Sequence, residues 1–476
     1  MTARSAISSR PEPVLRRLAI AGLCLGLIGP AWSDTTPAPV PSAELSLAEV
    51  RSLILRALDA GRPDIAGELA LSLLRADPED PFAHMVMSTV LMRAGNHVEA
   101  RRAAKLAYRH AETPRQKHEA ARVVAAAEAR DERFVLGQLW MRRALQAAPS
   151  EPTRDRTKRE YRALRSAAKL KFQLSGQIVP SSNVNNGAAD RINVVEGIPV
   201  VGILPATSQA LSGTIAEVGG SFTYRLHRDE TSETRLTGIG QVRRVAFSDE
   251  ARKKAPQAEE ADYGSTFAAL GLAHHRSLGG AGGLASARLS FGQVWNGGER
   301  SYDLASGGLS YGFDLDPTLR LTASLDYQLR HNDAAGIADV RTTGLRFSAI
   351  HRLANNDSLA LSLGSTMAES ENGQARAETR SAKLSYHRAE PIGPVSLSAS
   401  FGVSETTYPD YRLLFWAVPG GREDSRRTAE VTFSFDQLDY LGFSPTLTVT
   451  SEQTHSNVSR FETEELSVSL GLRSVF

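Results

Sequence analysis

Histidines are the side chains of this sequence best suited to acid–base chemistry, because imidazole titrates near neutral pH. Seven of them lie in the second part of the chain: His227, His274, His275, His331, His351, His387 and His455. A catalytic base must lie within hydrogen-bonding reach of its target, and no Ser/His/Asn or Asp/His group has a spacing that indicates such a site. We therefore expect no catalytic residue, no cofactor and no enzyme activity, and interpret these histidines as polar lining.

Metal and nucleic-acid chemistry are equally unsupported. The 476 residues include one cysteine, Cys24, so the sequence predicts neither a disulfide nor a thiolate metal site. The formal net charge is +2, which gives no sign of a nucleic-acid partner.

The N-terminus predicts a secretory signal peptide over residues 1–33. Four arginines precede the apolar stretch LAIAGLCLGLIGPA, and cleavage is expected near Ser33. The alternative is the start of a buried helix. Cys24 follows Leu23, where a lipoprotein signal needs a small residue, so we expect it to be removed rather than lipidated. Residues 34–42, DTTPAPVPS, then form a Pro-rich tether.

Residues 43–169 have helical periodicity and an internal repeat. The stretches LDAGRPDIAGELALSLL and MRAGNHVEARRAAKLAY align at a spacing of 34 residues. The aligned pairs are Ala60-Gly61 with Ala94-Gly95, Ala66 with Ala100, and Ala70 with Ala104. Paired helices of this period, with small residues where helices touch, resemble tetratricopeptide repeats, although their characteristic Trp and Tyr are missing. A plain helical bundle is the alternative.

After Lys169 the periodicity changes to two. In residues 318–330, TLRLTASLDYQLR, leucine, alanine and tyrosine alternate with charged and hydroxylated residues. Such segments are longer than the strands of an ordinary β-sandwich. Their length and their two unlike faces are typical of an outer-membrane β-barrel, spanning residues 170–476.

Fourteen segments show this pattern, and barrels of this class have an even number of strands. They are 170–179, 214–225, 233–247, 262–275, 284–295, 301–313, 318–330, 339–353, 358–369, 376–388, 393–407, 426–436, 443–454 and 460–476. With the helical domain in the periplasm, the long connections 180–213, 248–261 and 408–425 become external. Short connections such as 314–317 and 354–357 face the periplasm.

The final strand ends on Phe476, with Leu470 and Leu472 on an apolar face. A terminal aromatic residue on such a strand resembles the signal read by the barrel-assembly machinery, although Ser474 departs from the usual apolar choice. We expect Phe476, Leu472 and Leu470 to form that signal.

This architecture resembles the surface lipoprotein assembly modulator (Slam) family. The segment GQIVPSSNVNNG, with Pro180, Asn183 and Asn185, is similar to the family's P-x-x-N-x-N segment. Near the end, Gly442-Phe443-Ser444-Pro445 and Ser456-Asn457 resemble its final hairpins. The resemblance implies export of a client, either a surface lipoprotein or a secreted haem-binding protein. Further implied or possible partners are the barrel-assembly machinery, a periplasmic chaperone and outer-membrane lipid.

Two loop segments are candidates for contact with the client or for a gate. Leu413, Phe415 and Trp416 are apolar where a solvated loop should be polar; the alternative is an aromatic belt at the membrane interface. For Asn183 and Asn185 the alternative is turn chemistry. The basic stretch 99–169 suits anionic lipid, an acidic client or chaperone, or a solvated helix face.

Two other transport functions stay open. A tetratricopeptide-containing porin that exports polysaccharide has the same domain order, although the repeat region here is short for that class. A passive porin would leave the helical domain without a role. The sequence has no P-loop, so we expect export to be driven by client folding or binding outside the cell.

Overall fold

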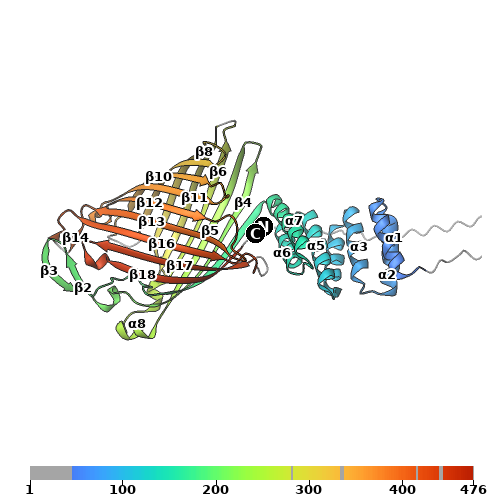
Figure 1. Cartoon of the computed structure of the whole chain (residues 1–476), viewed down its shortest axis with the longest axis horizontal. Helices are drawn as coiled ribbons and strands as arrows, with labels where there is room; N and C mark the ends of the chain where they lie inside the picture. Colours follow the sequence, from blue (N-terminus) through green and yellow to red (C-terminus); the bar gives the residue numbers. More distant parts are fainter. Residues whose placement is uncertain (1–44, 280–281, 333–336, 414–415, 439–442, 475–476) are drawn as a thin grey trace, which may run out of the picture. The chain divides into compact units, whose positions relative to one another are not determined.

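The computed structural model describes residues 45–476 except 280–281, 333–336, 414–415, 439–442 and 475–476 (Figure 1). The predicted signal peptide and the whole Pro-rich tether therefore lie outside the described residues, as do Phe415 and Phe476. Eight helices are described: α1 (Leu47–Asp59), α2 (Pro63–Ala76), α3 (Pro81–Arg93), α4 (His97–His110), α5 (Pro114–Arg130), α6 (Phe134–Gln146), α7 (Glu151–Ala167) and α8 (Asp249–Lys254). Among the described residues, no helix is both long and apolar enough to cross a membrane.

The 34-residue repeat predicted from the sequence is confirmed. Helices α1 and α3 begin 34 residues apart, as do α2 and α4. Gly61 and Gly95 end the first helix of each pair with φ angles of 70° and 79°, a conformation that glycine adopts without strain. The four aligned alanines, Ala66, Ala70, Ala100 and Ala104, are fully buried, which allows close approach of neighbouring helices.

A third helix pair, α5 and α6, continues the repeat and was not predicted. Glu132 takes the place of the turn glycine with a φ of 54°, so no glycine marks this turn in the sequence. Gly137 lies at the first turn of α6, where a side chain would crowd the Ala125 carbonyl at 3.1 Å and Leu164. The sequence signal is therefore hidden by substitution at the turn and by the greater length of α5.

The second part of the chain is a closed antiparallel barrel of fourteen strands, as predicted. Its strands are β1 (Leu170–Ser181), β4 (Gly213–Arg228), β5 (Ser232–Phe247), β6 (Ser265–Ser277), β7 (Leu284–Asn296), β8 (Glu299–Asp314), β9 (Leu319–Asn332), β10 (Val340–Arg352), β11 (Ser358–Ser370), β12 (Ala377–His387), β13 (Ser396–Tyr408), β16 (Arg422–Ser434), β17 (Phe443–Ser456) and β18 (Thr463–Ser474). Each pairs with the next along the chain, and β18 closes the barrel on β1.

Alternation of side chains divides the wall into two faces. The inward face carries ion pairs between strands. Arg243 on β5 pairs with Glu217 on β4, and Arg288 on β7 reaches across Gly308 of β8 to Asp326 on β9. The outward face carries exposed large apolar side chains, among them Phe291 at 69% and Leu470 at 62% of full exposure. An apolar outer surface around a polar lumen is the arrangement of a membrane-spanning barrel.

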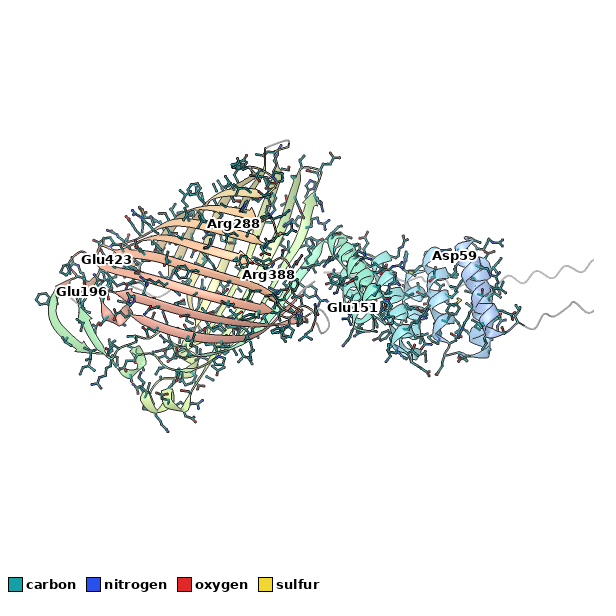
Figure 2. All side chains as sticks on the ribbon, in the orientation of Figure 1. Asp59, Glu151, Glu196, Arg288, Arg388 and Glu423 are labelled. Atoms are coloured by element: carbon teal, nitrogen blue, oxygen red, sulfur yellow. The ribbon has the colours of Figure 1, made fainter. Side chains whose placement is uncertain are left out.

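The two ends of the barrel differ in their connections. The loop end carries the long connections 182–212, 248–264 and 409–421, which contain the hairpins β2 (Ile192–Val195) with β3 (Ile198–Ile203), and β14 (Arg412–Leu413) with β15 (Trp416–Ala417). The opposite, turn end carries short connections such as 229–231 and 315–318. Figure 2 labels Glu196 and Glu423 at the loop end and Arg388 towards the turn end.

Four 3-10 turns complete the connections: η1 (Ala206–Ser208), η2 (Glu260–Tyr263), η3 (Gly373–Ala375) and η4 (Ser459–Phe461). The last of them corrects the final predicted strand. Residues 460–462 belong to the connection after β17, because Val458 is fully buried among loop residues and ends the alternation. The strand itself begins at Thr463.

Candidate functional site

Among the described residues, the junction of the first and last strands has the fewest facing pairs of any ladder in the barrel wall. Strands β1 and β18 share five facing pairs, whereas β10 and β11 share thirteen. Pairing with β18 is interrupted at Val179 and Pro180, while the same residues continue to pair with β4. Proline has no backbone N–H to donate to a ladder. This seam is therefore the part of the wall with the fewest backbone contacts to break.

A polar hollow of about 520 Å³ lies at the seam. It is lined from β1 by Gln173, Ser175 and Gln177 and from β18 by Gly471 and Arg473. Towards the turn end, β1 extends beyond β18: among the described residues, the facing pairs begin only at Ser175 with Arg473. The hollow thus lies along the described part of the closing ladder.

Side-chain hydrogen bonds partly compensate for the short ladder. Ser469 on β18 donates its hydroxyl to Gln177 on β1 at 2.8 Å, and Gln177 donates to Glu217 on β4 at 2.6 Å. Near the loop end, Ser181 donates to Glu465 at 2.7 Å. Each such bond contributes about 0.5–1.5 kcal/mol net, so water or other polar groups can replace these bonds across the seam at low cost.

Three connections at the loop end pack into one cluster, here called the cap. Its buried core is Val195 of the first connection, Tyr411 and Val418 of the connection 409–421, and Val458 after β17. Backbone and side chain bonds tie the segments together; Val194 N–H donates to Ser459 Oγ at 2.7 Å. These contacts join residues from opposite ends of the barrel sequence, so the cap lies over β1, β16, β17 and β18.

Arg422, the first residue of β16, contacts aromatic residues beneath and within the cap. Its guanidinium lies 3.7 Å from the ring centroids of both Tyr408 and Phe461 and pairs with Asp424 at 3.0 Å. Only 8% of Arg422 is exposed. A cation between two aromatic faces, with a carboxylate partner, stabilises a buried charge well.

A second apolar cluster fills the barrel mouth beside β1, β4 and β5. Inward-facing Ile215, Val245 and Phe247 pack against Leu211 and Ala251 from the connections 182–212 and 248–264. Arg243 links the same connections, donating to the carbonyls of Val184 at 2.8 Å and Tyr263 at 2.6 Å. The loops therefore close the mouth on this side of the lumen.

The predicted contact residues occupy different environments. Asn183 is buried and bonds to both the N–H and the carbonyl of Gly187, each at 2.8 Å. Asn185 bonds to the Gln209 carbonyl and the Leu211 N–H, both at 2.8 Å. These asparagines shape the first connection from within. Their role in client contact stays a prediction.

The apolar loop residues are more accessible. Trp416 is 52% exposed on the β14–β15 hairpin, whereas Leu413, its facing residue, packs against the cap core. Leu470 and Leu472 project from the outward face of β18, in line with the predicted assembly signal. Contact with a client or with the assembly machinery stays a prediction for all four.

The motif asparagine near the C-terminus also holds loops. Asn457 donates to the Gly421 carbonyl at 2.8 Å and accepts from the Glu423 N–H at 2.9 Å. No role for Asn457, Arg422 or Arg243 was predicted from the sequence. A signal for Arg422 exists in hindsight: Gly420 and Gly421 precede it, both with positive φ.

The histidines do not assemble into a site. His274 and His275 of β6 contact Thr234 at 2.9 Å and Ser286 at 2.8 Å on the two flanking strands, and His331 of β9 contacts Asp339 at 3.0 Å. Within the described ranges there is no group of three His, Cys, Asp or Glu placed to hold a metal.

Many basic residues of the stretch 99–169 form ion pairs or ring contacts within the helical region. Fully buried Glu128 pairs with Lys105 at 3.0 Å and Arg133 at 3.3 Å, and Arg122 pairs with Glu160 at 2.7 Å. Arg143 stacks on Trp140 at 4.3 Å. These contacts favour the interpretation as an internally paired helix surface over a free cationic patch.

The chain matches no known family model, and no curated protein matches it in sequence. Solved structures are similar to its two parts separately. The first TPR domain of Spaghetti (RPAP3), bound to an HSP90 peptide, is 18% identical with a TM-score of 0.23, covering 25% of this chain and 93% of its own. OmpTΔL8, a loop-deletion mutant of a Vibrio cholerae outer membrane protein, is 8% identical with a TM-score of 0.31, covering 64% and 99%. A BenF-like porin from Pseudomonas fluorescens Pf-5 is 10% identical with a TM-score of 0.36, covering 64% and 98%. With similarity this low, the assignment of the fold rests on the strand order of this chain.

Proposed function

We propose that this protein is an outer-membrane translocator that exports a specific client protein from the periplasm to the cell surface. In this proposal the turn end and the helical repeats face the periplasm, and the loop end faces outside. The client is a surface lipoprotein or a related haem- or iron-acquisition protein. That class follows from the resemblance to the Slam family.

The observation that carries the proposal is the short β1–β18 ladder beside a polar hollow. A stable porin has no need of a weak closing ladder, whereas a translocator whose client leaves sideways must separate two strands. The five facing pairs of this seam are the fewest of any ladder in the described wall. Lateral opening there would connect the lumen to the membrane.

The cap supports a gated route over permanent diffusion. Two apolar clusters and the buried Arg422 close the mouth above β1 and β18. A passive porin works best with an open mouth, so this feature favours regulated export. A polysaccharide exporter with a gated mouth is the competing function, and the polar lumen is compatible with it.

A comparison of surface proteins tests the proposal. Cells lacking the chain and cells complemented with the full chain are labelled from outside, and labelled proteins are identified by mass spectrometry. We expect one or a few proteins to leave the surface and accumulate in the periplasm. An unchanged protein surface with altered polysaccharide or solute uptake would contradict protein export and favour the competing function.

A further inference from the structure

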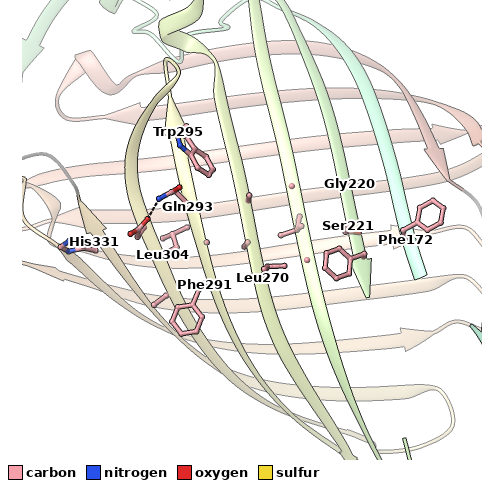
Figure 3. Close-up of a pocket in the computed structure, with 18 of the residues that line it drawn as sticks. Phe172, Gly220, Ser221, Leu270, Phe291, Gln293, Trp295, Leu304 and His331 are labelled. Atoms are coloured by element: carbon pink, nitrogen blue, oxygen red, sulfur yellow. Dashed lines mark hydrogen bonds between the residues drawn. The ribbon is translucent and has the colours of Figure 1, made fainter. Parts of the chain in front are cut away.

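A trench crosses the outward face of the barrel beside the seam (Figure 3). Its volume is about 870 Å³, within the range of roughly 300–1,000 Å³ typical of small-molecule sites. The register of the strands defines it. Gly220 of β4 faces Gly240 of β5, which faces Ala268 of β6, and this row of small residues forms the floor.

The neighbouring row forms an apolar wall. Phe222, Leu270 and Phe291 lie one row towards the turn end, joined through Gly238 in the same register. Val242 and Trp295 lie one row towards the loop end. The floor row of glycine and alanine lies between two rows with larger, mainly apolar side chains. The three rows together form a channel lined mainly by hydrocarbon.

Two glycines distinguish the wall of the trench from its floor. At Gly238 an added Cβ would collide with the ring of Phe222, so the protein's own aromatic side chain occupies that space. At Gly240 an added Cβ would meet only the Phe267 carbonyl, at 3.8 Å. Where no protein side chain covers the floor, as at Gly240, a hydrocarbon chain from outside the protein can make dispersion contacts with the lining.

The trench ends in polar groups. Along the floor row, Ala268 faces Gln293, which faces Asp303, and Asp303 faces His331. Gln293 donates to Asp303 at 2.9 Å, the bond drawn in Figure 3, and Arg300 pairs with the same carboxylate. Gln293 and Asp303 lie near the loop ends of their strands. One end of the trench is therefore suited to an ester or headgroup and the remainder to a hydrocarbon chain.

The dimensions fit one acyl chain. Neighbouring strands are about 4.8 Å apart, so the four intervals from Asp303 on β8 to Gly220 on β4 span about 19 Å. One leaflet of a hydrocarbon core of about 30 Å is about 15 Å deep, and the row is inclined because barrel strands are tilted.

We propose that this trench binds an acyl chain of a bilayer lipid, with the lipid's polar end at Gln293, Asp303 and His331. The bilayer is the source because the trench lies in the apolar face of the wall, where such chains surround the protein. The site is distinct from the export route and does not depend on it.

Photocrosslinking tests this assignment. The full chain is reconstituted in dioleoyl phosphatidylcholine vesicles containing a phospholipid with a diazirine at the end of one acyl chain. We expect crosslinks on β4–β6 to exceed those at outward Leu345 and Phe347 on β10 by about fivefold, the ratio from roughly 1 kcal/mol of preferential binding. Equal crosslinking around the wall would overturn the assignment.

Filling the floor provides the matched variants. The double variant Gly240→Leu/Ala268→Leu should reduce crosslinking of the trench to the level of β10. Gly307→Leu, which adds the same group to an outward glycine outside the trench, should leave it unchanged. If the double variant fails to fold, the comparison of crosslinking on β4–β6 with crosslinking on β10 in the wild-type protein still tests the assignment.

Native mass spectrometry of the full chain extracted from membranes identifies the source. We expect an adduct with the mass of one bilayer lipid, reduced in the double variant and kept in Gly307→Leu. An adduct with the mass of a lipidated polypeptide would overturn the assignment, because a client's anchor would then be the occupant.

Discussion

The wall around β1 and the wall around β10 follow the same alternating pattern of side chains, but they differ in strand pairing and in the shape of their outward surface. Strands β10 and β11 share thirteen facing pairs and are joined by a short turn, in which Leu353 N–H donates to the Asp357 carbonyl at 2.8 Å. Around β1 the closing ladder has five pairs, the outward face is hollowed and long connections cover the mouth. Regular pairing supplies stability around β10, and the proposed export route lies where the described pairing is shortest.

Locking each wall with a disulfide should separate them most strongly. Ser181 and Ser467 face each other across the seam, and Ser348 and Ser362 face each other on β10 and β11. Paired Ser→Cys changes are nearly isosteric, and facing residues meet the distance that a disulfide needs. We expect the oxidised seam pair to reduce surface display of the client by about tenfold or more, since it blocks a gating motion.

The β10–β11 pair is the control and should leave display unchanged. Reduction should restore export in the seam variant. Equal export from both oxidised variants would show that the seam stays closed during transport, and the client would then have to pass along the lumen axis.

Arg422→Ala should open the cap. The change removes a guanidinium that stacks on Tyr408 and Phe461 and pairs with Asp424, contacts worth about 0.5–2 kcal/mol each when desolvated. We expect several-fold higher ion conductance in planar bilayers and faster proteolysis within 409–421. Arg376→Ala, which breaks a half-exposed pair with Asp410 at the same end, should change neither, because exposed pairs contribute about 0–1 kcal/mol.

Restoring the missing donor in the seam should have a smaller effect. Pro180→Thr supplies a backbone N–H where pairing with β18 is interrupted. One added ladder bond is worth about 1 kcal/mol, so export should fall about two- to fivefold and the barrel should unfold at a higher temperature. Pro317→Thr, in the β8–β9 turn, is the control. An increase in export would show that Pro180 does not weaken the closing ladder.

The sequence predicted the wall but not what distinguishes its two sides. Alternation depends on each residue's own position, so all fourteen strands were found within a few residues. The trench depends on register across the six strands from β4 to β9, which turns and bulges such as the one between Arg225 and His227 determine. The cap depends on contacts between residues far apart, such as Val194 with Ser459. Neither leaves a local pattern in the sequence.

Acid should destabilise turns of both walls at the turn end. Each of these turns depends on an ionised aspartate that accepts hydrogen bonds from serine or threonine. The Ser232 hydroxyl and the backbone N–H groups of Thr231 and Ser232 lower the pKa of Asp229, and Thr318 lowers that of Asp316 in the same way. A lowered pKa means that the ionised carboxylate stabilises each turn above the ordinary value of 3.8, and that this contribution is lost as pH falls through the lower value in the folded protein.

The protection of the Ser232 and Leu319 amides against hydrogen exchange should therefore fall only below about pH 4, because these amides donate to the two carboxylates. The loss should be larger at Ser232, because the pKa of Asp229 is lowered further than that of Asp316. Asp229→Asn should remove the pH dependence at Ser232 and leave that at Leu319. If the two turns instead responded at clearly different pH values, the contrast between the walls would extend to the turn end.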